Sequence, residues 1–131
     1  ELLCERPELI PAAVEEAARF DAPVQGFRRT VTAPVTLAGT ALEPGATVFV
    51  AYGSAGRDQG GGFDITRPPV RHLSFGHGVH ACPGSALARE QLRITLELLV
   101  SRLPGLRLAP GEVEMLPTLI HRGPAALHLE W

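Results

Sequence analysis

The chain has 131 residues, of which 45% are hydrophobic, and a formal net charge of -2. This composition predicts one soluble globular domain, and without a basic excess there is no reason to expect a nucleic-acid partner. No apolar run is long enough to span a membrane and no signal peptide is visible, so no membrane partner is expected. The two cysteines, Cys4 and Cys82, do not suggest a disulfide framework, and a reducing, cytoplasmic location fits them best.

The first twenty residues predict helical structure. The sequence starts with Glu1 rather than methionine, inside a helix expected over residues 1–6, which suggests a fragment of a longer protein. Residues 7–20 predict a second helix, because they are rich in helix-forming residues, and Pro23 ends it.

Short strands and a second long helix are expected after Pro23. The β-branched and aromatic segments that predict strands are residues 27–31, 35–37 and 47–50, with turns at Gly39 and 44–45. Residues 59–62 contain three glycines and form a flexible breaker. Residues 83–103 predict one long helix with a leucine stripe. The closing strands are expected at residues 106–108, 113–119 and 127–131.

A glycine-rich loop ends on a single cysteine, Cys82, directly before the long helix. The positive end of the helix dipole favours thiolate over thiol at this position. A lone thiolate is wrong for structural zinc or an iron–sulfur cluster, which need several cysteines, but it suits one axial bond to a haem iron. The alternative is a buried, inert thiol, which is the usual state of an isolated cysteine.

The residues around Cys82 suit that axial bond. Gly76 and Gly78 let the backbone take positive φ and turn tightly, and Phe75 can pack under the sulfur and exclude water. The pattern Phe-x-x-Gly-x-His-x-Cys-x-Gly resembles the haem-binding signature of the cytochromes P450, which are haem-thiolate monooxygenases. The residues that this resemblance assigns to haem binding are Phe75, Gly78, His80, Cys82, Gly84 and Ala88. It makes Cys82 the proximal thiolate on the iron, and His80 a donor to a propionate.

Two further constellations follow from the resemblance. Glu16 and Arg19 share a helix face and by themselves would form a solvated surface pair. Together with Arg67 they resemble the family's second signature, which implies a structural charge network. Arg29 resembles the arginine that the family offers to a haem propionate; Arg28 competes with it, and the spacing from Arg19 favours Arg29. The alternative for Arg29 is a solvated arginine at a sheet edge.

The family's substrate contacts map onto five largely apolar residues, which are Val24, Gln25, Phe27, Leu119 and Ile120. The resemblance implies an α+β chain that corresponds to the C-terminal part of a mainly α fold, with a Glu-x-x-Arg helix, small β-sheets, a cysteine-ligand loop and a long following helix. Residues 1–131 would be the C-terminal fragment of a cytochrome P450 domain, without the N-terminal part and the central oxygen-activating helix.

The function implied by the resemblance is a haem-thiolate monooxygenase that inserts oxygen into an apolar small molecule once the missing part is present. Haem b would be the cofactor, with electrons arriving indirectly from NAD(P)H through a ferredoxin or flavoprotein reductase. The alternative is a non-catalytic or degenerate fragment that acts as a haem-binding or protein-interaction module. A third reading is a small haem-thiolate sensor or peroxide-driven oxidant, which needs only an accessible iron.

Overall fold

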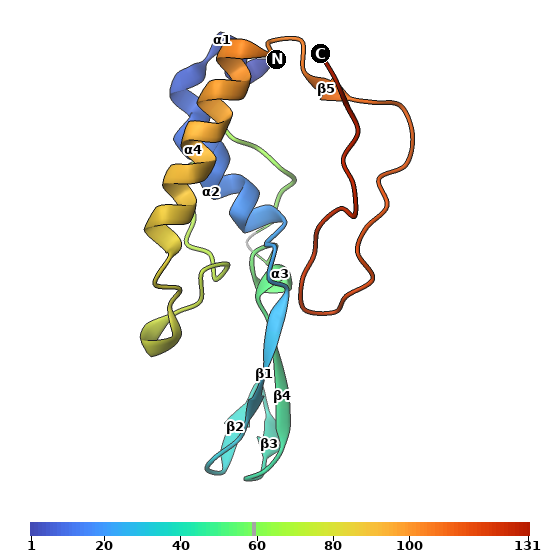
Figure 1. Ribbon diagram of the computed structural model, residues 1–131. Helices are drawn as coiled ribbons and strands as arrows, with labels where there is room; N and C mark the ends of the chain where they lie inside the picture. Colours follow the sequence, from blue (N-terminus) through green and yellow to red (C-terminus); the bar gives the residue numbers. More distant parts are fainter. Residues whose placement is uncertain (59) are drawn as a thin grey trace.

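The computed structural model describes residues 1–58 and 60–131; Gln59, which the sequence analysis placed in the flexible breaker, lies outside them. Figure 1 shows two helices side by side, a β-ribbon that extends away from them, and a long C-terminal segment on the other side. The α-helices are α1 (Leu2–Glu5), α2 (Ile10–Phe20), α3 (Tyr52–Ala55) and α4 (Ser85–Arg102). The strands are β1 (Gly26–Thr30), β2 (Val35–Leu37), β3 (Thr40–Leu42), β4 (Thr47–Ala51), β5 (Arg107–Leu108) and β6 (Leu129–Glu130).

The core is centred on α2, as its run of helix formers predicts. A 3-10 turn, Pro7–Leu9, leads into α2, and Pro11 occupies the first turn, where its missing N–H leaves no bond unmade. The buried apolar side chains of the described residues are Ile10, Ala13, Val14, Ala18 and Ala22. Burial of a side chain such as Ile10 or Val14 contributes about 1.5–3 kcal/mol each.

The long helix α4 packs against α2 but is less buried than a core helix. It begins at Ser85 with Gly84 as its N-cap, two residues later than predicted, so Pro83 precedes the helix instead of opening it. Leu96 and Leu99 line an apolar groove shared with α1 and α2. Leu87 is 63% exposed, so the predicted leucine stripe is divided between this groove and solvent.

The β-structure consists of three separate two-stranded antiparallel ribbons, β1–β4, β2–β3 and β5–β6. Gly26 pairs with Ala51 at one end of the β1–β4 ribbon and Thr30 with Thr47 at the other. Strand β3 and helix α3 were not predicted from the sequence. Its prediction of a strand over residues 113–119 was wrong, since Met115 forms only an isolated bridge to Pro124. Two prolines, Pro117 and Pro124, remove N–H donors that a longer ladder would need.

The combination of helices with small antiparallel sheets confirms the predicted α+β class. The described helices include none with the length and apolar character needed to cross a bilayer. In Figure 1 the loop that precedes α4 lies across from β1 and α3, which sets two distant parts of the sequence opposite one another.

Candidate functional site

The loop before Cys82 is closed by backbone hydrogen bonds. Gly76 and Gly78 have φ of 70° and 65°, the left-handed region that favours glycine. At Gly76 a side chain is also excluded by space, because a Cβ would lie 2.9 Å from the His80 carbonyl oxygen. The Cys82 N–H donates to the Phe75 carbonyl at 2.7 Å, which fixes the cysteine relative to the aromatic residue at the start of the loop.

Cys82 itself is exposed and stands just before α4. A Cβ at Gly84 would meet its Sγ at 3.8 Å, which is ordinary van der Waals contact. Packing within the chain therefore does not require glycine at position 84. The Ala88 N–H donates to the Gly84 carbonyl at 2.9 Å, so Ala88 lies one helical turn beyond Gly84.

A cavity of about 610 Å³ adjoins the cysteine. One wall comes from the loop and the other from β1 and α3. The residues that line it are Pro23, Val24, Phe27, Arg29, Tyr52, Ser74, Phe75, Gly76, His80 and Cys82. The cavity thus combines a thiol, aromatic rings and a guanidinium. Among the described residues no group of three or more His, Cys, Asp or Glu side chains could hold a metal ion.

Phe75 is packed from behind by an ionic cluster. The Arg89 guanidinium carbon lies 4.2 Å from the centroid of its ring, and the His72 ring centroid lies 6.0 Å away. Glu15 on α2 contacts both Arg89 and His72. Arg89 Nη2 donates to Glu15 Oε2 at 3.1 Å, and His72 Nε2 lies 3.1 Å from the same oxygen. Arg89 and then His72 hold the pKa of Glu15 below its ordinary value, against the effect of burial.

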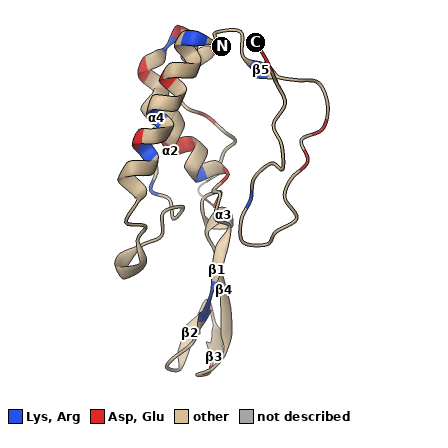
Figure 2. Ribbon diagram, in the orientation of Figure 1, with Lys and Arg blue, Asp and Glu red and all other residues tan. Residues whose placement is uncertain are grey.

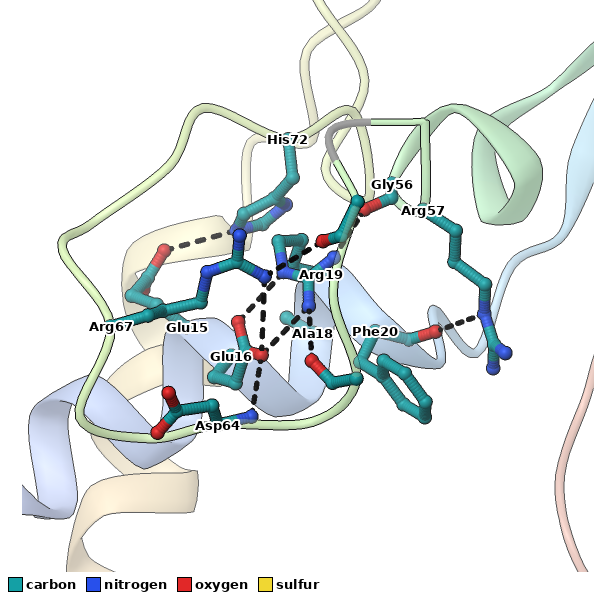
Figure 3. Close-up of polar contacts among 12 residues, drawn as sticks. Glu15, Glu16, Ala18, Arg19, Phe20, Gly56, Arg57, Asp64, Arg67 and His72 are labelled. Carbon is teal, nitrogen blue, oxygen red and sulfur yellow. Dashed lines mark hydrogen bonds and ion pairs between the residues drawn. The ribbon is translucent and has the colours of Figure 1, made fainter.

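Figure 3 shows a second charge network, in which the structure brings Glu16, Arg19 and Arg67 together. Arg19 forms a bidentate pair with Glu16, with both N···O distances at 2.7 Å. The two side chains are 2% and 5% exposed, so the solvated alternative does not describe them. Arg67 is the looser member, with Nη1 3.8 Å from Glu16 Oε1.

The charge network ties α2 to two later segments. Arg19 Nη1 donates to the Gly56 carbonyl at 2.6 Å, and the Asp64 N–H donates to Glu16 Oε1 at 2.9 Å. Arg19 and the Asp64 N–H lower the pKa of Glu16, in that order, while burial opposes them. Arg67 also donates to the Gly60 carbonyl at 3.2 Å, so the glycine-rich segment contacts the network.

The two competing arginines on β1 face different surroundings. Arg29 lines the cavity beside Cys82, whereas Arg28 lines a separate hollow with Phe49 and residues 118–121. This separation follows from the alternation of side chains along a strand. Figure 2 shows the basic stretch on β1 and the mixed charges of α2 and α4.

The five candidate substrate residues divide into three groups. Val24 and Phe27 line the cavity beside Cys82. Leu119 and Ile120 line the neighbouring hollow, which shares Phe27 with that cavity. Gln25 lines neither, because its amide donates to the Ala22 carbonyl at 2.6 Å and so turns back toward the end of α2.

Sequence reasoning missed three residues of this region, Glu15, Arg89 and Tyr52. Glu15 and Arg89 are 74 positions apart, so no local pattern joins them. Tyr52 lies two residues after the end of the strand predicted at residues 47–50, and pairing that strand with the one at 27–31 would have pointed to it.

Comparison with known proteins identifies the fold. The cytochrome P450 family model matches residues 60–114. The mycinamicin IV hydroxylase/epoxidase of Micromonospora griseorubida is 42% identical over 138 residues, which cover 98% of this chain and 35% of that protein. The crystal structure of CYP109E1 from Bacillus megaterium with testosterone has 36% identity and a TM-score of 0.91, over 98% of this chain and 37% of that one.

The heme domain of Acinetobacter radioresistens CYP116B5 gives a TM-score of 0.93 at 35% identity, over 99% of this chain and 33% of that one. The chain thus spans about a third of the length of the relatives that it matches. Nearly the whole chain takes part in these matches, and they confirm the resemblance to the cytochromes P450 that was drawn from the Cys82 loop.

Proposed function

We propose that these 131 residues form the haem-ligating part of a haem-thiolate monooxygenase, which becomes complete with the regions of a cytochrome P450 that lie outside them. The complete protein would bind haem b and insert oxygen into an apolar small molecule. The observation that carries the proposal is the exposed Cys82 thiol on the wall of a cavity of about 610 Å³.

The residues present fit a haem group. Cys82 can supply one thiolate, and the described residues contain no cluster that would complete a metal site, so a metal bound here must bring its other ligands with it. A porphyrin does so with four nitrogens. Phe27 and Phe75 supply apolar surface in the cavity, and Arg29 and His80 can face the anionic carboxylates of the ring.

Haem, when bound, supplies the iron at which dioxygen is activated. The chain's own residues would hold and shield it. Cys82 would provide a thiolate ligand, and Phe75, whose carbonyl accepts from the Cys82 N–H and whose ring is backed by Arg89, would exclude water from the sulfur. Val24 and Phe27 line the same cavity and would contribute apolar contacts to the substrate.

The names of the relatives support a carbon-rich substrate. One relative is a mycinamicin IV hydroxylase/epoxidase, and one structural neighbour was crystallised with testosterone. Monooxygenation also needs electrons, and we assign their delivery to a ferredoxin or flavoprotein partner that draws on NAD(P)H. The free thiols of Cys4 and Cys82 fit a reducing, cytoplasmic compartment.

The test is a carbon monoxide difference spectrum of the reduced protein, prepared as its gene encodes it and supplied with haem. The expected result is the Soret band characteristic of thiolate ligation, which Cys82→Ser abolishes. Cys4→Ser is the matched control, because Cys4 is the other exposed cysteine and contacts the Pro104 carbonyl instead of the cavity.

Two results would overturn the proposal. One is a flat spectrum after haem is supplied, which would favour the non-catalytic module. The other is a Cys82→Ser spectrum identical to that of the unsubstituted protein. Turnover with peroxide but not with a reductant would instead identify a peroxide-driven oxidant.

A further inference from the structure

Three side chains form a compact cluster on the wall opposite Cys82. Phe27 and Arg29 lie two residues apart on β1 and so share a face of the strand. The Arg29 guanidinium carbon lies 5.8 Å from the Phe27 ring centroid. The Tyr52 ring meets the Phe27 ring edge-on, with centroids 6.1 Å apart. Both aromatic rings therefore limit where the guanidinium can lie.

The backbone holds the cluster in place. Tyr52 directly follows β4, whose last residue Ala51 pairs with Gly26 at the start of β1. The Gly53 N–H donates to the Gln25 carbonyl at 3.1 Å, which keeps the start of α3 against the segment that enters β1. Tyr52 is thus attached to the same rigid ribbon that carries Arg29.

Arg29 faces the cavity, and it has no counter-ion within the described part of the chain. Its Nη1 donates to the Arg28 carbonyl at 2.9 Å and its Nη2 to the Tyr52 hydroxyl oxygen at 3.1 Å. Among the residues that the structure describes, no carboxylate lies within ion-pair distance of it. A guanidinium has five N–H donors, so it retains capacity for an anion in the cavity.

Tyr52 has donor capacity as well. Its oxygen accepts the bond from Arg29, and a phenol that accepts a hydrogen bond still carries its own proton. Within residues 1–58 and 60–131 no acceptor for that proton is found. Both Tyr52 and Arg29 line the cavity that Cys82 and His80 bound on the other side.

We propose that Tyr52 and Arg29 form a two-donor clamp for a carboxylate, in which Tyr52 is a second cofactor-positioning residue. The Tyr52 oxygen accepts from Arg29 and orients the guanidinium, while its O–H donates to the same carboxylate. The inference rests on the proposed function, because the carboxylate is then a propionate of haem. A hydrogen bond to a charged group is stronger than one between neutral groups, so the hydroxyl has a measurable effect.

The test compares haem with haem dimethyl ester, which has the same ring but no free carboxylates. Each is loaded into the protein as its gene encodes it, and the rate of transfer to excess apomyoglobin is measured without substrate. Tyr52→Phe should speed the loss of haem about tenfold while the loss of the dimethyl ester stays unchanged. Arg29→Ala should show the same selectivity.

Ser74→Ala is the matched control, because it removes another hydroxyl from the cavity wall. Ser74 Oγ donates to the Ala18 carbonyl at 2.6 Å, so its loss should not distinguish haem from the ester. The clamp is overturned if Tyr52→Phe speeds the loss of both porphyrins equally, which indicates ring packing, or of neither. If the unsubstituted protein retains neither porphyrin, the proposed function itself fails and the clamp fails with it.

Discussion

The two polar constellations of this chain are organised in opposite ways. In the α2 network, Glu16 and Arg19 are almost fully buried and hydrogen-bond to each other and to the backbone. At the cavity, Cys82, Arg29 and His80 are exposed, and none of them has an ion-pair partner within the described residues. The first constellation is complete within the chain, whereas the second lacks ion-pair partners among the described residues, as expected if the proposed function is right and haem binds there.

The helix that carries the buried network also positions the residues of the cavity. From α2, Arg19 bonds to Gly56 just after α3, the Ala18 carbonyl accepts from Ser74 in the loop before Cys82, and Glu15 pairs with Arg89 on α4. One helix therefore anchors α3 and the loop, which contribute to the cavity walls, and α4, which follows that loop. This arrangement puts the site on a rigid support, which is what precise ligation requires.

The largest expected effect is the loss of the buried pair. Arg19→Ala leaves the buried Glu16 carboxylate with only the Asp64 N–H and the more distant Arg67, so the free energy of unfolding should fall by about 3–5 kcal/mol. Arg19→Lys keeps the charge but loses the planar fork, and it should recover only part of that loss. The measurement is urea-induced unfolding followed by circular dichroism.

Arg93→Ala is the control for that prediction. Arg93 also pairs with two carboxylates, those of Glu90 and Glu97, but on an exposed face of α4. Solvent screens such pairs, so the unfolding midpoint should not move. Equal destabilisation by Arg19→Ala and Arg93→Ala would show that burial is not what distinguishes the network.

The contact between α2 and the end of α3 can be tested sterically. A Cβ at Gly56 would lie 2.3 Å from the Arg19 carbonyl oxygen, so Gly56→Ala must push the two segments apart. The expected loss is about 1–3 kcal/mol of stability, because added atoms in a packed site force backbone shifts. Gly123→Ala is the control, since a Cβ there meets nothing within 4 Å. Unchanged stability of Gly56→Ala would contradict the close packing.

The sequence predicted much of this architecture. The helix-forming run of residues 7–20 and the β-branched and aromatic residues around β1 and β4 are local signals, and α2, β1 and β4 lie close to where they were expected. The cysteine loop carries its own pattern in Gly76, Gly78 and Cys82. These features can be predicted from a sequence because they depend mainly on residues that are close together along the chain.

The rest depends on contacts between distant residues. Arg89 meets Glu15 and Phe75 only because α4 packs on α2, and Tyr52 reaches Arg29 only through the register of β1 with β4. The strand expected at residues 113–119 does not form, and the reason is local. Pro117 has no N–H to donate to a neighbouring strand, which the pattern of apolar residues alone does not reveal. Hydrophobic periodicity therefore located elements but not the pairs of side chains that complete the site.

Acid should weaken the buried network selectively. The pKa of Glu16 is lowered chiefly by Arg19, so its contribution to stability is present above its ordinary value of 4.5 and is lost as the pH falls through the lower folded-state pKa. The unfolding free energy of Glu16→Gln should therefore depend less on pH below 4.5 than that of the unsubstituted protein. Glu90→Gln should change the dependence less, because Arg93 also lowers the pKa of Glu90 but solvent screens this exposed pair. Parallel pH profiles for all three proteins would contradict the assignment.

The smallest expected effect concerns the sulfur itself. Pro83 follows Cys82 and has no N–H, so one backbone donor that could reach the sulfur is missing. Fewer hydrogen bonds leave more charge on a ligating thiolate and lower the reduction potential of its iron. Pro83→Leu restores the donor and should raise the potential, at most by roughly 40 mV if the new bond contributes about 1 kcal/mol to the reduced state alone.

Potentiometric titration of the haem-loaded protein measures this shift, and Pro83→Ala separates its causes. Alanine restores the same N–H without the bulk of leucine, so a rise in both variants assigns the effect to the hydrogen bond. A rise in Pro83→Leu alone would show that the restored N–H is not its cause. An unchanged or lower potential in both would mean that the backbone after Cys82 does not reach the sulfur, although its neighbour Gly84 would place a Cβ only 3.8 Å from Sγ.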